Sequence, residues 1–220
     1  MATANEPGLI MTSIEFFQVG GFWMYPILLT LIAGVFIGFE RYFFLAGLAN
    51  RNGKIWSELY PIMTKGNFKQ ALETAKNSNS FMGNIIAAGL TRAANARRTE
   101  DIELAMEEAL MEVLPRIEKR THYLSTLANV AVLLGLLGTI IGLIHAFTAV
   151  ASADPSEKAN MLSAAVGEAM NCTAFGLVTA IPLLVVFSFL QSKAGETVAS
   201  FEAASVKCLN VIRQISSRTE

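Results

Sequence analysis

Residues 124–151 read LSTLANVAVLLGLLGTIIGLIHAFTAVA and contain no aspartate, glutamate, lysine or arginine. A helix needs roughly 20 mostly apolar residues to cross about 30 Å of hydrocarbon, so this stretch is long enough to span a bilayer. Because lipid cannot satisfy open backbone groups, the stretch is expected to be helical. It therefore predicts a transmembrane helix and places the chain among membrane proteins.

Two further stretches have the same character. Residues 22–45 are apolar except near Glu40 and Arg41, which are expected in the headgroup layer, and residues 161–190 carry one acid, Glu168. Three such segments cannot close a barrel, so all should be helices. Of the 220 residues, 53% are hydrophobic and 16% are charged, against about a quarter charged in soluble domains. The predicted fold class is all-α, a polytopic membrane protein with three transmembrane helices.

Basic residues are distributed unevenly along the chain. Of the 17 lysines and arginines, twelve lie in residues 41–120, four in residues 191–220 and one, Lys158, between the second and third stretches. By the positive-inside rule, the two basic segments are expected in the cytoplasm and the N-terminus outside it. The residues before the first stretch include Glu6 and Glu15 but no lysine or arginine, which indicates a permanent span and not a cleaved signal peptide.

These features predict an order of segments along the chain. They are a periplasmic N-terminal segment (1–21), transmembrane helix 1 (22–45), a cytoplasmic helical domain (46–123), transmembrane helix 2 (124–151), a periplasmic loop (152–160), transmembrane helix 3 (161–190) and a cytoplasmic C-terminal helix (191–220).

Apolar stripes at helical spacing occur in residues 100–120 and in the last thirty residues. The second and third helices are therefore expected to be long and to extend into the cytoplasmic helical domain. No turn signal separates residues 100–120 from the second span, which predicts one helix of about 50 residues, with a kink at Pro115. We expect the two stripes to pack against each other. Their members are Ile102, Met106, Ala109, Val113 and Ile117, and Val198, Phe201, Ser205, Cys208, Ile212 and Ile215.

Small residues recur one turn apart within the spans. Gly135, Gly138 and Gly142 lie in the second span, and Gly176 begins a small-xxx-small pair in the third. In lipid such residues let helix backbones approach closely. We predict helix-packing roles for these four glycines and place Pro182 with them.

Polar side chains inside the spans are the candidates for function, because each needs a partner or water in hydrocarbon. Thr139 and Thr173 lie at one depth, about 16 Å from the outer boundary at 1.5 Å per residue, so they could form a ring. A transmembrane threonine usually bonds to a carbonyl of its own helix instead. Glu168, roughly 7 to 8 Å nearer the outer face, is expected to be protonated, hydrated in a cavity, bonded to another helix or facing interfacial water.

Other polar groups in the spans have weaker claims. His145 could belong to a proton relay, but its place near the outer boundary favours an interfacial hydrogen bond. Asn129, Asn171 and Cys172 are expected to be helix-contact groups.

Several classes of function are excluded by what the sequence lacks. With a net charge of -1, the chain has no excess of basic residues to bind the phosphates of nucleic acid. HExxH, CxxC, GxxxxGK[ST] and GxSxG motifs are absent from the sequence, so we expect no metal, no cofactor and no enzymatic site. Three spans with one acid also lack the inverted repeats of a complete transporter.

Three strings together resemble the MotA/TolQ/ExbB proton-channel family, and most closely its three-span TolQ and ExbB branch. The first is GGFWMYPILL at residues 20–29, which leads to Glu40 and Arg41. The second is LLGLLGTIIGLIHAF at residues 133–147, and the third is GEAMNCTAFGLVTAIP at residues 167–182.

The resemblance implies an inner-membrane motor subunit that forms a homopentamer around a TolR/ExbD-like partner with a single span. In that family the partner's transmembrane aspartate carries the proton, and threonines of the second and third spans line the lumen beside it. By position these threonines are Thr139 and Thr173, and the third-span glutamate that faces the pore is Glu168. The implied function is a proton channel, driven by the proton motive force, that powers work in the periplasm or at the outer membrane.

The chain also departs from the family pattern. Val132 stands where a proline is frequent, and the polar asparagine common near Ser188 is absent. The flagellar stator branch, with four spans, fits less well than the three-span branch. Two other hypotheses remain, a structural scaffold that conducts no ions and a channel that needs no partner.

Overall fold

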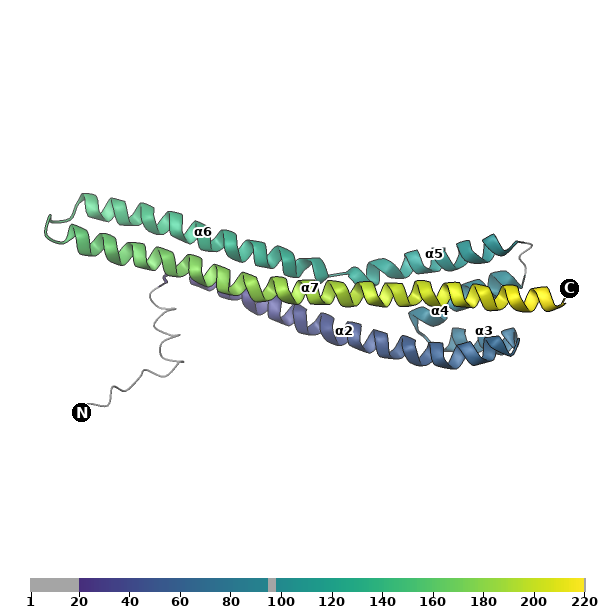
Figure 1. Cartoon of the computed structure of the whole chain (residues 1–220). Coiled ribbons are helices and arrows are strands. Elements are labelled where there is room, and N and C mark those ends of the chain that lie inside the picture. The colour runs from purple at the N-terminus through teal and green to yellow at the C-terminus, as the bar shows by residue number, and fades with distance from the viewer. Residues whose placement is uncertain (1–19, 95–97, 220) are drawn as a thin grey trace, which may run out of the picture. The chain divides into compact units, whose positions relative to one another are not determined.

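The computed structural model describes residues 20–94 and 98–219, so most of the predicted N-terminal segment, residues 1–19, lies outside the described residues. Over the described ranges the chain is all-helical, as predicted (Figure 1). The helices are α2 (Met24–Thr64), α3 (Phe68–Asn77), α4 (Phe81–Ala93), α5 (Thr99–Glu118), α6 (Thr121–Ala151) and α7 (Lys158–Thr219).

Three helical stretches are long and apolar enough to cross a membrane, which confirms the predicted fold class. They begin at Met24, Thr99 and Lys158. The last is α7, a helix of 62 residues with Pro182 inside it. The first helix also continues far beyond its apolar part, to Thr64, although a long extension was expected only for the second and third.

Two compact units divide the chain. The first, which we call the apolar unit, contains residues 20–39 and 122–188, and the second, the polar unit, contains residues 40–121 and 189–220. Both α2 and α7 contribute to each unit.

In the apolar unit, α6 lies alongside the first part of α7 (Figure 1). The start of α2 packs on α7, where Gly34 meets Leu183 and Gly38 meets Val186. Large apolar side chains point outward, and 62% of Leu133 and 65% of Val178 are exposed. Outward apolar side chains are expected where the surrounding solvent is lipid or another subunit.

The polar unit combines α3, α4 and α5 with the ends of α2 and α7. Two short helices have side-chain caps: the Asn67 side chain accepts from the Gln70 amide at 3.4 Å and Ser80 from the Gly83 amide at 2.9 Å. Such caps satisfy amide groups that the first turn leaves open. The core is made of apolar residues from all five segments, including Met63, Ile85, Met106, Ile117 and Phe201.

The predicted apolar stripes lie in this core. In α5, Ile102, Met106, Val113 and Ile117 are buried, and in α7 Phe201, Cys208 and Ile212 are buried. Met106 lines a groove with Ser205 and Leu209 of α7, but it also packs at Gly89 of α4. The stripe of α5 therefore contacts two helices, where one partner was expected.

The predicted continuous helix over residues 100–151 is divided by a two-residue break. The break is at Lys119 and Arg120 and not at Pro115, which lies inside α5. Arg120 has a φ of 67°, which is uncommon for a residue other than glycine. Helix α2 supplies the partners, because Glu40 accepts from Arg120 at 2.6 Å and Arg41 donates to the Ile117 carbonyl. The Arg41 bond satisfies a backbone carbonyl at the interrupted helix end, and the Glu40–Arg120 pair joins α2 to the break.

Candidate functional site

Helices α6 and α7 approach through backbone atoms at their small residues. A Cβ atom added to Gly135 would lie 3.1 Å from the Thr173 Cα atom, and one added to Gly176 would lie 2.7 Å from the Ala131 carbonyl oxygen. Gly138 meets Cys172, and Gly142 meets Ala169 at 3.2 Å. All four glycines predicted for helix packing therefore lie at close contacts. Pro182 is exposed.

The close approach brings together two hydroxyl groups that were predicted to lie at one depth. Thr139 and Thr173 are half-buried, and their Oγ1 atoms are hydrogen-bonded to each other across the two helices. The Gly135 carbonyl lies 3.0 Å from each hydroxyl. Thr139 thus makes the ordinary bond to its own helix and also a bond that joins α6 to α7.

The number of protons limits how these bonds can exist together. Each hydroxyl has one proton to donate and two lone pairs to accept with. One arrangement has Thr139 donating to Thr173, which donates to the Gly135 carbonyl, and the other reverses the order of the two threonines. The two hydroxyl groups can therefore exchange donor and acceptor roles without a change in the number of hydrogen bonds. Such a pair can adapt to a neighbouring donor or acceptor.

Glu168 lies in a separate setting within the apolar unit. It lines a cavity of about 390 Å³ together with His145, Cys172 and Trp23. Among the described residues Glu168 makes no hydrogen bond to Thr139 or Thr173. Of the alternatives for this carboxylate, the position beside an open cavity favours hydration, and the structure brings His145 to the same cavity.

Two contributors to this cavity were missed by the sequence analysis, Gly20 and Trp23, and so was Gly21, which contacts Glu168. The adjacent glycines were the available signal, since paired glycines before a helix indicate a tight backbone approach. Gly21 has a φ of 72°, and the Glu168 carboxylate lies where its Cβ atom would be.

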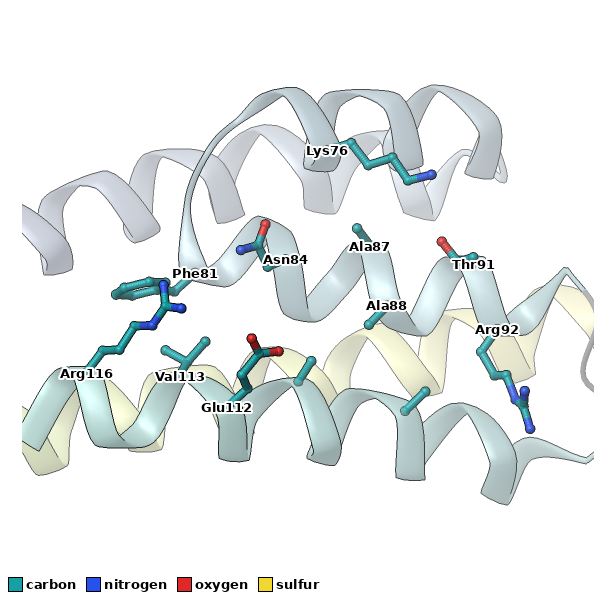
Figure 2. A pocket seen from close by; sticks show the side chains of 12 residues that line it. Lys76, Phe81, Asn84, Ala87, Ala88, Thr91, Arg92, Glu112, Val113 and Arg116 are labelled. Atoms are coloured by element: carbon teal, nitrogen blue, oxygen red, sulfur yellow. The ribbon is translucent and has the colours of Figure 1, made fainter.

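The polar unit contains a groove of about 670 Å³ between α4 and α5. Figure 2 shows Arg92 and Arg116 at its two ends and Lys76 of α3 above it. Four small residues also line the groove, Ala87, Ala88, Ala105 and Ala109, and their short side chains leave its space unfilled. Three cations and one acid line the groove, which gives it a positive rim.

Within the described ranges, no three His, Cys, Asp or Glu side chains come together in a way that could hold a metal ion. The candidate groups of the apolar unit are the hydroxyl groups of Thr139 and Thr173, the Glu168 carboxylate and the His145 imidazole. Such groups accept, donate and relay protons.

Comparison with known proteins gives a consistent result. The sequence profile described as the MotA/TolQ/ExbB proton channel family matches residues 77–203, which is more than half of the chain. An ExbB-like protein of Synechocystis sp. is 28% identical over 92% of this chain and 80% of its own length.

Two further relatives carry the names of both branches. The biopolymer transport protein ExbB of Aquifex aeolicus is 31% identical over 56% of this chain and 80% of its own length. The Tol-Pal system protein TolQ of Haemophilus influenzae is 35% identical over 40% of this chain and 38% of its own length. Together with its three long apolar helices, these matches show that the chain is a multi-pass membrane protein that belongs to the MotA/TolQ/ExbB proton channel family.

Proposed function

We propose that this chain is the inner-membrane subunit of a motor driven by the proton motive force. It forms a proton channel with a TolR/ExbD-like partner and powers work in the periplasm or at the outer membrane. The observation that carries the proposal is the hydroxyl pair of Thr139 and Thr173, which joins two apolar helices of a proton-channel family member.

Hydroxyl groups suit this role because they can both donate and accept. A proton-carrying aspartate of a partner would change from acceptor to donor as it is protonated. In both arrangements the two hydroxyl protons are donated, one within the pair and one to the Gly135 carbonyl, and free lone pairs can accept from a protonated aspartate. A hydroxyl that gives up its bond to the Gly135 carbonyl can donate to the ionised aspartate, so the pair can serve both states of that group. This explains how a chain whose spans carry one acid, Glu168, apart from Glu40 in the headgroup layer can contribute to proton movement.

The proposed assembly is a homopentamer around the single-span partner, with Thr139, Thr173 and Glu168 facing the lumen. The apolar side chains that are exposed in the single chain would contact lipid and neighbouring subunits. In the proposed topology the N-terminus is periplasmic and the C-terminus cytoplasmic, because sixteen of the 17 basic residues then lie inside. The spans would be residues 22–45, 124–151 and 161–190.

Variants of the threonines test this function. We expect Thr139→Val or Thr173→Val to reduce proton uptake by on the order of 100-fold, the lower end of the losses when one polar group that stabilises a developing charge is removed. Uptake is measured with an entrapped pH dye in liposomes that contain the chain and its single-span partner. Thr173→Ser keeps the hydroxyl and should retain most of the uptake, and Glu168→Ala should reduce it.

Thr148→Val is a matched control, since this exposed threonine of α6 only donates to the Ile144 carbonyl of its own helix, at 2.8 Å. Full uptake by Thr139→Val and Thr173→Val, with normal assembly, would contradict the assignment of the pair. If substitution of the partner's aspartate also leaves the system's activity intact, the chain is a structural scaffold. Uptake by this chain without a partner would identify a self-sufficient channel.

A further inference from the structure

The start of α2 and the carboxylate of α7 meet at a glycine. Gly21 lies in the left-handed backbone region with a φ of 72°, three residues before α2 begins at Met24. An added Cβ atom at Gly21 would overlap the Oε1 atom of Glu168 and lie 3.2 Å from its Cδ atom. The Glu168 carboxylate therefore lies directly against the Gly21 backbone.

Glycine meets two separate requirements here. The positive φ is one that residues with a Cβ atom rarely adopt. The space that a Cβ atom would need is already filled by the carboxylate. Either requirement alone would favour glycine, and only the second concerns Glu168.

The location also suits a negative group. The Met24 amide donates to the Gly21 carbonyl at 3.3 Å, so Gly21 belongs to the turn that leads into α2. The first turn of a helix has free amide groups and a positive potential. The first turn of α2 contains no acidic residue of its own, and the carboxylate nearby comes from α7.

We propose that Gly21 is a positioning residue for Glu168, holding its carboxylate at the start of α2 and at the cavity that it shares with His145 and Trp23. A side chain at position 21 displaces the carboxylate from this place. An effect of Gly21 on proton uptake rests on the proposed function of Glu168 in the proton pathway. The positioning of the Glu168 carboxylate by Gly21 does not depend on that function.

The geometric statement is tested without any measurement of transport. In a Trp56→Phe background, Trp23 is the remaining tryptophan, and it lines the same cavity as Glu168. Glu168→Gln should change the Trp23 emission, because it alters a carboxyl group that lines the same cavity as Trp23. With Gly21→Ala present, the effect of Glu168→Gln should be lost. An equal effect in both backgrounds, or no effect in either, overturns the proposal.

Two variants separate the carboxylate from the backbone conformation. Asparagine tolerates a positive φ better than alanine, so Gly21→Asn relieves the conformational cost but keeps the clash with Glu168. We expect Gly21→Asn to abolish the Trp23 response as Gly21→Ala does. A normal response in Gly21→Asn overturns the proposal, since strain alone would then explain the alanine variant.

Proton uptake by the full complex gives the functional test. We expect Gly21→Ala to reduce uptake by up to about 100-fold, the loss that a misplacement of about 1 Å can cause. Adding Glu168→Asp, whose shorter side chain makes room for the new methyl group, should restore part of the uptake. In a Glu168→Ala background Gly21→Ala should have no further effect, which is the sign of coupled sites.

Gly167→Ala is the matched control. It places a methyl group beside Glu168 in sequence, but the added Cβ atom meets nothing within 4 Å. Uptake and the Trp23 response should stay normal in this variant. Lack of rescue by Glu168→Asp, or additive losses with Glu168→Ala, would overturn the positioning role. If Glu168→Ala itself has normal uptake while the Trp23 results hold, the proposed function of Glu168 is wrong and the geometric inference stands.

Discussion

In the apolar unit α6 and α7 meet through glycine backbones, whereas the core of the polar unit is made of large apolar side chains and includes the buried Arg41. Gly176 approaches the Ala131 carbonyl, and Thr139 bonds to Thr173. In the polar unit Phe201 and Met63 are fully buried, and Arg41, which is 4% exposed, donates to a helix-end carbonyl.

The difference follows from the two solvents that the family assignment implies. In lipid, burying an apolar side chain gains nothing over leaving it outside, so helices associate through close packing and interhelical hydrogen bonds. In water, burial of apolar area drives association. The apolar unit keeps few polar groups, and two of them, Thr139 and Thr173, bond to each other across its helices, which makes them functional candidates.

The largest expected effect is on backbone packing in the apolar unit. Gly176→Ala would bring a Cβ atom to 2.7 Å from the Ala131 carbonyl oxygen, so α6 and α7 must separate. We expect a loss of about 3 kcal/mol in the free energy of unfolding, as for a strongly overpacked core. Unfolding in mixed detergent micelles measures it.

The control lies on the same helix in the polar unit. Gly195 of α7 has nothing within 4 Å of an added Cβ atom. Gly195→Ala should therefore be neutral or stabilise the protein by up to about 1 kcal/mol through its higher helix propensity. Equal destabilisation by the two substitutions would show that the units do not pack differently.

The next effect is on the buried charge of the polar unit. The Arg41 guanidinium lies 4.9 Å from the centroid of the Phe44 ring and donates to the Ile117 carbonyl. Arg41→Met keeps the apolar stem and leaves that carbonyl without its donor, so we expect a loss of about 2 kcal/mol in the free energy of unfolding.

Arg120→Met is the comparison, because the 2.6 Å pair of Arg120 with Glu40 is partly exposed. A solvent-exposed pair contributes about 0.2 to 1 kcal/mol, so this variant should cost less than Arg41→Met. Thermal unfolding of both variants in one detergent provides the measurement. A larger loss of unfolding free energy in Arg120→Met would mean that the exposed pair stabilises the break between α5 and α6 more than Arg41 does.

The smallest effect is a pH dependence that comes from burial in the polar unit. Burial raises the pKa of the Cys208 thiol to about 12, and its sulfur lies 3.7 Å from that of Met63. In the unfolded chain the thiol ionises at its ordinary pKa, whereas the folded chain keeps its proton. The contribution of the Cys208 thiol to the free energy of unfolding is therefore fully present at neutral pH. It is lost as the pH rises from about 9 toward 12.

Between about pH 8 and pH 10 the loss should be about 1 kcal/mol. The measurement is the free energy of unfolding at both pH values for the natural chain and for Cys208→Ser, which cannot ionise in this range. The serine variant should show the smaller decrease. An identical decrease in both chains would mean that Cys208 ionises as readily when folded.

Much of the fold could be predicted because the signals are local. The lack of charge in residues 124–151 predicts a membrane-compatible helix in any context, and the spacing of Ile102, Met106 and Val113 predicts which face is buried. Equal depth was predicted for Thr139 and Thr173 from the lengths of their spans, but the direct bond between the two hydroxyl groups was not.

Other features could not be predicted, because they depend on partners distant in sequence. The break at Arg120 is stabilised by Glu40 and Arg41, 80 and 76 residues from their partners. Nothing in the residues around Arg120 indicates a helix end. The groove between α4 and α5 likewise depends on how alanines of two helices face each other.

The sequence by itself determined that this chain is a three-span helical protein with a small set of polar groups in its spans. That follows because the backbone in lipid must satisfy its own hydrogen bonds, which leaves few possible structures, and because polar side chains in lipid are costly and rare. Only the tertiary structure decided which of these groups meet. It paired Thr139 with Thr173 across Gly135 and placed Glu168 against Gly21, because glycines without side chains let these helices approach within hydrogen-bonding range.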